Sequence, residues 1–372
     1  MLVGVPKEIK NHEYRVGLTP AAVHELCKAG HKVMVQNDAG TSIGLDNAEY
    51  QKAGAEMVAA PAEIFKRADM IVKVKEPQAN ECVMLREDQI LFTYLHLAPD
   101  PEQAAALMKS GAHAIAYETV TDERNRLPLL APMSEVAGRM SIQAGAHYLE
   151  KTYGGRGVLL SGVPGVMAGN VVVLGGGVVG TNAAKVAIGM GAHVTVIERS
   201  NERMKELDMF FGASINTVYA TDYAIEKYAL EADLVIGAVL VPGASAPRLI
   251  TREMIGQMKK GSVLVDVSID QGGCFETSKA TTHADPVYTV DGVIHYCVAN
   301  MPGAVARTST FALNNATLPY VLALAEKGYK KALLENPGFR KGLNVSKGKI
   351  THKEVAEALN QNYQAAEDAL AA

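Results

Sequence analysis

A buried-strand pattern that runs into a glycine-rich turn constrains this chain more than any other feature. Residues 171–174 read Val-Val-Val-Leu and lead into the spacing G-x-G-x-x-G at 175–180, and a helical pattern follows at 181–191. A second β-branched run at 193–197 ends on Glu198, roughly 20 residues after the first glycine. This order of strand, glycines, helix, strand and acid is typical of a dinucleotide-binding Rossmann fold.

Each part of this motif has a physical task. We expect Gly175 to permit the tight turn, Gly177 to let a pyrophosphate approach the backbone, and Gly180 to let the helix pack closely on the strand. The helix N-terminus offers N–H groups to the phosphates, and Glu198 accepts hydrogen bonds from the adenosine ribose. The alternative is a glycine-rich turn in an α/β core that binds no ligand.

Length and composition limit the other possibilities. A chain of 372 residues suggests two or three domains, because one core rarely grows beyond about 250–300 residues. The formal net charge of −4 gives no electrostatic footprint for nucleic acid or for an anionic membrane surface. No apolar run approaches the roughly 20 residues that span a bilayer, and the chain opens on a strand pattern at 2–5 without a basic and apolar leader.

The four cysteines lie far apart and lack the C-x-x-C or His-paired spacing of a metal site. We interpret them as reduced structural thiols and expect a cytoplasmic protein; they are Cys27, Cys82, Cys274 and Cys297.

The alternation of short apolar runs with helical patterns predicts the fold class. Strand, helix and strand in succession imply parallel sheets covered on both faces, so we expect an α/β fold with two Rossmann-like doubly wound parallel-sheet domains. The dinucleotide domain would be inserted in the substrate domain, with the active site in the cleft between the two. The predicted boundaries are 1–128 for the first part of the substrate domain, 129–306 for the NAD-binding domain with a linker helix, and 307–372 for C-terminal helices that complete the substrate domain.

Individual elements follow from the same patterns. In the N-terminal part they predict strands at 2–5, 31–35, 70–74, 90–95 and 113–116, and helices near 21–29, 62–67 and 101–110. Further along they predict strands at 234–239, 263–267 and 293–298, and helices at 134–151, 307–326 and 352–370, with a loop at 333–350. Ser134 has the chemistry of an N-cap for the first of these helices, although the same hydroxyl could face a ligand.

Four polar residues follow predicted strands, where ligands of open parallel sheets bind. Arg15 lies in the loop after the first strand, Lys75 and His96 follow the strands near 70–74 and 90–95, and Asp270 follows the strand at 263–267. Arg15 can hold a carboxylate through two parallel hydrogen bonds, and Lys75 can hold the same group or polarise a carbonyl. His96 can accept and return a proton near neutrality, and Asp270 can orient water or ammonia or accept a proton from an amine. Together they suit nicotinamide chemistry on a small 2-amino or 2-oxo acid.

Each of these residues also has a structural explanation. Arg15 and Lys75 have charged neighbours and could belong to solvated surface loops. His96 could be a hydrogen-bonded structural histidine. Asp270 could cap its own turn, because Asp commonly bonds nearby backbone groups.

Several motifs in order resemble the alanine dehydrogenase family across essentially the whole chain. They are Val5-Pro6-Lys7-Glu8, residues 13–20 (Glu-Tyr-Arg-Val-Gly-Leu-Thr-Pro), Val74-Lys75-Glu76-Pro77, residues 94–98 (Tyr-Leu-His-Leu-Ala), residues 133–138 (Met-Ser-Glu-Val-Ala-Gly) and the glycine motif. The resemblance implies reversible oxidative deamination of L-alanine to pyruvate and ammonium with NAD, two Rossmann-like domains and a homohexamer.

The resemblance also implies roles for particular residues. Arg15 and Lys75 would bind substrate, and His96 and Asp270 would be the acid and base residues. The NAD site would comprise Ser134, Gly175, Gly177, Val178, Val179, Gly180, Glu198, Arg203, Ala220, Val239, Leu240, Val267, Ser268, Ile269, Asp270, Lys279, Val298, Ala299, Asn300 and Met301.

Three departures from the family pattern bear on this site. The ribose acid is often Asp in the family and is Glu198 here, a longer carboxylate that should still reach the hydroxyls. Ala220 stands where some members have Ser, which removes one hydrogen bond on the adenine side. Some members carry a Glu and His pair for Mg²⁺ in the C-terminal helix, where this chain has Ala323 and Lys327, so we expect no metal.

Two other functions compete with this one. The NAD-binding subunit of proton-translocating transhydrogenase shares the fold and many motifs but binds no amino acid, which would leave Lys75 and His96 without a task. A non-catalytic NAD-sensing or scaffold protein would leave all four polar residues at strand ends without one. L-Alanine turnover with NAD separates the three.

Overall fold

The computed structural model describes residues 1–239 and 246–371, which form two compact units. The first unit combines 1–133 with 305–372, and the second comprises 134–304. Each is built on a mostly parallel sheet with helices between successive strands, which confirms the predicted α/β class. Among the described residues, no helix is both long enough and apolar enough to cross a membrane.

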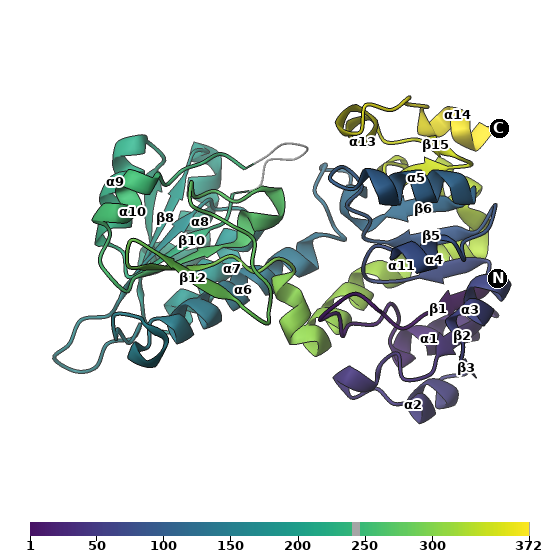
Figure 1. The fold of residues 1–372 in the computed structure, drawn as a ribbon, viewed down its shortest axis with the longest axis horizontal. Helices are drawn as coiled ribbons and strands as arrows, with labels where there is room; N and C mark the ends of the chain where they lie inside the picture. The colour runs from purple at the N-terminus through teal and green to yellow at the C-terminus, as the bar shows by residue number, and fades with distance from the viewer. Residues whose placement is uncertain (240–245, 372) are drawn as a thin grey trace. The chain divides into compact units, whose positions relative to one another are not determined.

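The first unit has an eight-stranded sheet in the order β15-β14-β6-β5-β4-β1-β2-β3 (Figure 1). The six strands from β1 to β6 pair in parallel, and β14 and β15 add an antiparallel edge beside β6. The strands are β1 Leu2–Val5, β2 Lys32–Gln36, β3 Glu56–Val58, β4 Met70–Val72, β5 Ile90–Thr93, β6 His113–Ala116, β14 Leu343–Ser346 and β15 Lys349–Ile350. The helices are α1 Pro20–Lys28, α2 Asn47–Lys52, α3 Pro61–Arg67, α4 Ala79–Cys82, α5 Pro101–Ser110, α11 Ala306–Glu335, α12 Pro337–Arg340, α13 Lys353–Ala358 and α14 Ala366–Ala371.

The C-terminal segment departs from the sequence prediction in two places. The predicted loop at 333–350 contains the end of α11, the short helix α12 and the hairpin of β14 and β15. The hairpin pairs with β6, so the C-terminal part completes the sheet of the first unit as well as covering it with helices. The single helix predicted at 352–370 is two short helices, because Tyr363 bridges to Ile350 between α13 and α14. Figure 1 shows this yellow segment beside β6 and α5.

The second unit has a seven-stranded sheet in the order β12-β13-β11-β10-β7-β8-β9, parallel except for the edge strand β12. The strands are β7 Asn170–Leu174, β8 His193–Glu198, β9 Asn216–Tyr219, β10 Leu234–Gly237, β11 Val263–Asp266, β12 Val287–Val290 and β13 Val293–Tyr296. The helices are α6 Ala131–Tyr148, α7 Val178–Gly189, α8 Asn201–Phe211, α9 Asp222–Glu231 and α10 Arg252–Gln257. From β7 the chain moves outward through β8 and β9, and it then returns to β10 on the other side, so the strand order reverses between β7 and β10. Open α/β sheets bind their ligands at such a point.

Helix α6 begins earlier than the sequence predicted. It starts at Ala131, so Ser134 lies in the first turn and is not the N-cap. Further along, the missing side chain of Gly138 allows close packing on α7, because a Cβ there would lie 2.2 Å from the carbonyl oxygen of Val179.

Candidate active site

Three of the four predicted site residues lie at one edge of the first unit's sheet. β1, β4 and β5 are parallel neighbours, so their carboxyl ends meet at the same edge. Arg15 is in the segment after β1, and Lys75 and His96 follow β4 and β5 closely. The fold therefore places these side chains where an open parallel sheet binds ligands.

Arg15 is buried and paired, which excludes the solvated-loop alternative. Its side chain is 2% exposed, and its Nε and Nη2 donate to the two carboxylate oxygens of Glu13 at 2.7 and 2.6 Å. Nη1 lies 3.1 Å from the sulfur of Met133. Burial works to lower the pKa of Arg15, but the hydrogen bonds and charge of Glu13 hold that pKa above its usual value. Glu13 thus fixes the direction of the guanidinium.

Lys75 is held through its backbone as well as its side chain. Its Nζ lies 3.7 Å from Glu76, and its side chain is only 12% exposed, so the solvated-loop alternative is also wrong for this residue. Burial alone would raise the pKa of Glu76, but Lys75 and Lys10 lower it. The backbone N–H groups of Val74 and Lys75 both donate to Oε1 of Glu8, at 2.7 and 3.3 Å.

A buried ion triad lies directly beneath this loop. The Nζ of Lys73 donates to Glu8 at 3.0 Å and to Glu81 at 2.7 Å, and all three side chains are 3% exposed or less. Burial disfavours the charge of Lys73, but the two carboxylates raise its pKa above the usual value. Because Glu8 also binds the backbone of Lys75, the triad connects the core of the sheet to the predicted substrate residue.

His96 has a left-handed backbone conformation, with φ at 49°, which residues other than glycine rarely adopt. Its N–H donates to Glu118 Oε1 at 2.7 Å, and the N–H of Leu95 donates to both oxygens of Glu118 at 3.1 and 3.2 Å. The ring of Tyr94 stacks on the imidazole, with centroids 5.8 Å apart and planes inclined by 12°. The hydroxyl of Tyr94 donates to the carbonyl oxygen of Leu129 at 2.6 Å, which anchors that ring.

The glycine motif of the second unit forms the turn that the sequence predicted. Gly175 has φ at 95°, and a Cβ on Gly180 would lie 1.8 Å from the carbonyl oxygen of Gly175 and 3.1 Å from the side chain of Val173. A Cβ on Gly177 would meet nothing within 4 Å, and Gly177 is the N-cap of α7 without a side-chain cap. The fold thus requires glycine at 175 and 180, whereas Gly177 leaves open space at the N-terminus of α7. Helix N-termini with unpaired backbone N–H groups commonly bind phosphates.

Glu198 and Arg203 hold the glycine turn from the side. The carboxylate of Glu198 accepts from Gly176 N at 2.7 Å and from the backbone N–H groups of Arg199 and Ser200 at 2.7 and 2.9 Å. Arg203 donates from Nε to the carbonyl oxygen of Gly176 at 2.7 Å. The longer acid is therefore fixed beside the glycine turn, at the end of β8.

The loop after β11 is organised by Asp266 and not by Asp270. Asp266 is completely buried and accepts from the backbone of Ser268 at 3.0 Å and of Cys274 at 2.9 Å, and the hydroxyl of Ser278 also donates to it. Burial raises the pKa of Asp266, against these hydrogen bonds. Asp266 caps the turn, while Asp270 is exposed within the short 3₁₀ helix Val267–Gln271.

Several of the other predicted NAD residues follow the carboxyl ends of strands in this unit: Ala220 follows β9, Ser268 follows β11 and Val298 follows β13. Ser268 donates from its hydroxyl to the carbonyl oxygen of Val239 at 2.7 Å, and Ala220 donates from its backbone to the carbonyl oxygen of Glu198 at 3.0 Å. The backbone N–H of Lys279 donates to the hydroxyl of Tyr288 at 2.7 Å. Ser134 lies in α6, Val178 and Val179 begin α7, and Val267 and Ile269 lie in the 3₁₀ helix after β11. The last four predicted residues follow β13, namely Val298, Ala299, Asn300 and Met301. Leu240 lies outside the described residues.

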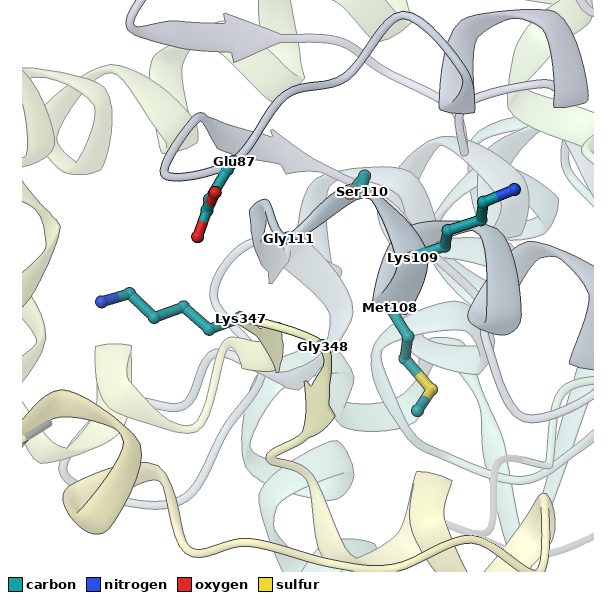
Figure 2. A pocket seen from close by; sticks show the side chains of 7 residues that line it. All are labelled: Glu87, Met108, Lys109, Ser110, Gly111, Lys347 and Gly348. Carbon is teal, nitrogen blue, oxygen red and sulfur yellow. The ribbon is translucent and has the colours of Figure 1, made fainter.

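A shallow cavity of about 260 Å³ lies at the opposite edge of the first unit's sheet (Figure 2). It is lined by Glu87, by the end of α5 with Gly111 directly after it, and by Lys347 and Gly348 of the turn between β14 and β15. This is the amino edge of β6, so the cavity is separate from Lys75 and His96. Within the described ranges, no three His, Cys, Asp or Glu side chains converge as a metal site would require.

Four organising carboxylates were missed by the sequence analysis: Glu8, Glu13, Glu118 and Asp266. Each sits at the end of a strand or in the segment that follows it. That position was the available signal, but Glu8 and Glu118 act on residues more than 20 positions away, a pairing that only the fold reveals.

Comparison with known proteins finds relatives that match along nearly the whole chain. The family model for the N-terminal domain of alanine dehydrogenase/PNT matches residues 4–137, and the model for the C-terminal domain matches residues 141–353. The chain is 59% identical over 363 residues, 98% of each protein, to an alanine dehydrogenase of Halomonas elongata. A solved L-alanine dehydrogenase superposes with a TM-score of 0.94 at 51% identity, covering 97% of this chain and 99% of that one.

A more distant solved structure, a transhydrogenase from Sinorhizobium meliloti, superposes with a TM-score of 0.81 at 26% identity, covering 94% of this chain and 100% of the other. With both family models matched in order along its length, this chain belongs to the alanine dehydrogenase/PNT family.

Proposed function

We propose that this protein is an NAD-dependent L-alanine dehydrogenase, which interconverts L-alanine with pyruvate and ammonium. The observation that carries the proposal is the match over 98% of the chain, at 59% identity, to an alanine dehydrogenase. The grouping of Arg15, Lys75 and His96 at one sheet edge supports it independently, because these residues supply a carboxylate anchor and a proton carrier.

Arg15 and Lys75 bind the substrate carboxylate in this proposal. Glu13 accepts from Nε and Nη2 of Arg15 and so fixes the guanidinium that binds the substrate carboxylate. The sulfur of Met133, a weak acceptor, lies 3.1 Å from Nη1 and is a weaker partner than a carboxylate. Lys75 adds a second positive charge on a backbone that Glu8 fixes.

The second unit binds NAD in this proposal. Gly177 and the N-terminus of α7 take the pyrophosphate, and Glu198 accepts from the ribose hydroxyls. When bound, NAD supplies the acceptor for the hydride that leaves the substrate Cα.

His96 moves the protons of the remaining steps. Loss of hydride converts the neutral amine of the substrate into an iminium, to which water adds at the carbon. His96 takes one proton of that water and returns it to the nitrogen, so that ammonia leaves while the remaining hydroxyl releases its proton and becomes the carbonyl of pyruvate. Asp270 orients the water or the departing ammonia.

The finer properties of the protein are also proposals. We expect a homohexamer, as the family resemblance implies, and mass measurement by light scattering tests it. We expect a reducing, cytoplasmic location, which is supported by the free thiols at all four cysteines, Cys27, Cys82, Cys274 and Cys297.

The test is an absorbance assay on the purified protein. NADH should appear when L-alanine and NAD are added, and it should be consumed when pyruvate and ammonium are supplied. A transhydrogenase subunit or a non-catalytic NAD-binding protein would bind NADH and leave L-alanine unchanged, and that result would overturn the proposal.

A further inference from the structure

His96 is held by its backbone in a strained position. A positive φ of 49° is unfavourable for a residue with a Cβ, so the surrounding contacts must impose it. The imidazole direction depends on this backbone, because the side chain leaves from the same Cα. Whatever fixes the loop after β5 therefore fixes the imidazole.

The carboxylate of Glu118 makes that contact. Its Oε1 accepts from the N–H of His96 at 2.7 Å and of Leu95 at 3.1 Å, and its Oε2 accepts from Leu95 at 3.2 Å. Two successive N–H groups thus converge on one carboxylate. Hydrogen bonds to an ionised acceptor are stronger than those between neutral groups.

The topology explains why a side chain is needed here. β5 and β6 are parallel neighbours whose ladder ends with Thr93 opposite Ala116. Beyond that pair the backbone of β6 turns into the 3₁₀ segment Tyr117–Thr119, so it offers no further carbonyl in strand geometry to the loop after β5. Glu118, within that segment, reaches sideways and replaces the missing acceptors.

The opposite side of the same loop is held separately. The side-chain amide of Gln103, from α5, donates to the carbonyl oxygen of Leu95 at 3.0 Å, and Gln103 is 7% exposed. Gln103 holds the carbonyl oxygen and Glu118 holds the N–H of the same planar peptide between Leu95 and His96. The two contacts can be removed independently.

We propose that Glu118 is the positioning residue of His96: it keeps the imidazole in the orientation in which it exchanges protons with the substrate. The inference rests on the proposed function, since it assigns Glu118 a role in that reaction. Glu118 acts only through His96, and it takes no proton itself.

A double-mutant cycle tests this mode of action. Glu118→Ala should lower kcat by about 10- to 100-fold, the range expected when a reacting group is misplaced by about 1 Å, with KM for pyruvate and affinity for NADH nearly unchanged. In a His96→Ala background the same substitution should change kcat less than about twofold, because residues that act as one unit are not additive. Glu118→Gln keeps one oxygen acceptor and the side-chain length, so its kcat should fall between wild type and Glu118→Ala.

Asp69→Ala is the matched control. Asp69 also accepts a backbone N–H, from Leu2 at 2.8 Å, but it does so at the amino edge of the same sheet. Its removal should leave kcat unchanged, and melting curves of all the variants check that they fold.

If the wild-type protein oxidises L-alanine, two results would overturn the inference. One is wild-type kcat in Glu118→Ala, and the other is an equal loss in the wild-type and His96→Ala backgrounds. A crystal structure of Glu118→Ala gives a readout without activity: we expect φ of His96 to leave the positive region, and an unchanged φ would also overturn the inference. Absence of L-alanine turnover in the wild type would instead contradict the proposed function.

Discussion

Removing the buried cation of the triad should destabilise the first unit strongly. Lys73→Met keeps an unbranched side chain of similar length but leaves Glu8 and Glu81 buried without their common partner. All three side chains are 3% exposed or less, so water does not compensate. Breaking a buried ion pair in this way costs about 3–5 kcal/mol. At about 2–4 °C per kcal/mol for a unit of this size, the melting temperature should fall by roughly 6–20 °C.

The pH dependence gives this prediction a second signature. Burial raises the pKa of Glu8, and Lys73 is the charge that opposes this rise. Without Lys73 the folded-state pKa rises further above the unfolded value, so stability is lost as the pH increases through that window. The deficit in melting temperature should therefore be larger at about pH 8 than at about pH 5, near the usual range of a carboxyl group.

Scanning calorimetry at both pH values measures the effect. The matched control is Lys327→Met, because Lys327 pairs with Glu335 on the surface, with the two side chains 43% and 46% exposed. That change should cost no more than about 1 kcal/mol. A Lys73→Met melting temperature within about 2 °C of wild type, or the same deficit at both pH values, would refute the reasoning.

Three further predictions concern the site. His96→Ala should lower kcat by at least about 100-fold with NADH affinity nearly unchanged, and near-normal turnover would remove its acid–base role. Gly177→Ala should fold normally but bind NADH more weakly, whereas Gly180→Ala should lower the melting temperature, because a Cβ on Gly180 would lie 1.8 Å from a backbone oxygen and a Cβ on Gly177 would meet nothing within 4 Å. The same NADH affinity and the same melting temperature in both variants would contradict this. Glu198→Ala should narrow the preference for NAD over NADP in kcat/KM by about tenfold, or ~1.4 kcal/mol, and an unchanged ratio would refute its role.

The parallel sheets were predictable because their signals are local. Buried parallel strands appear as continuous apolar runs, and the predicted strand near 70–74 overlaps β4 at Met70–Val72. The β14–β15 hairpin was missed, since Leu343–Ser346 is short and contains Asn and Ser, and its pairing partner β6 lies more than 200 residues away. Such edge strands are defined by the neighbour they join and not by their own composition.

In the candidate site, too, only the residues with a local sequence signal were predicted. Arg15, Lys75 and His96 were found because each follows an apolar run, and the glycines because their spacing has a steric cause. Their supporting carboxylates were not found, because an acid in a polar loop looks like any solvated charge. Only the fold shows that Glu118 meets the backbone of His96.

Transfer of an isotopic label tests the central claim most directly. L-Alanine carrying deuterium at Cα is incubated with NAD and the wild-type protein, and the coenzyme is examined by NMR. We expect one deuterium at C4 of the reduced nicotinamide for each pyruvate formed. Pyruvate formed without deuterium in the coenzyme, or no pyruvate at all, would contradict it.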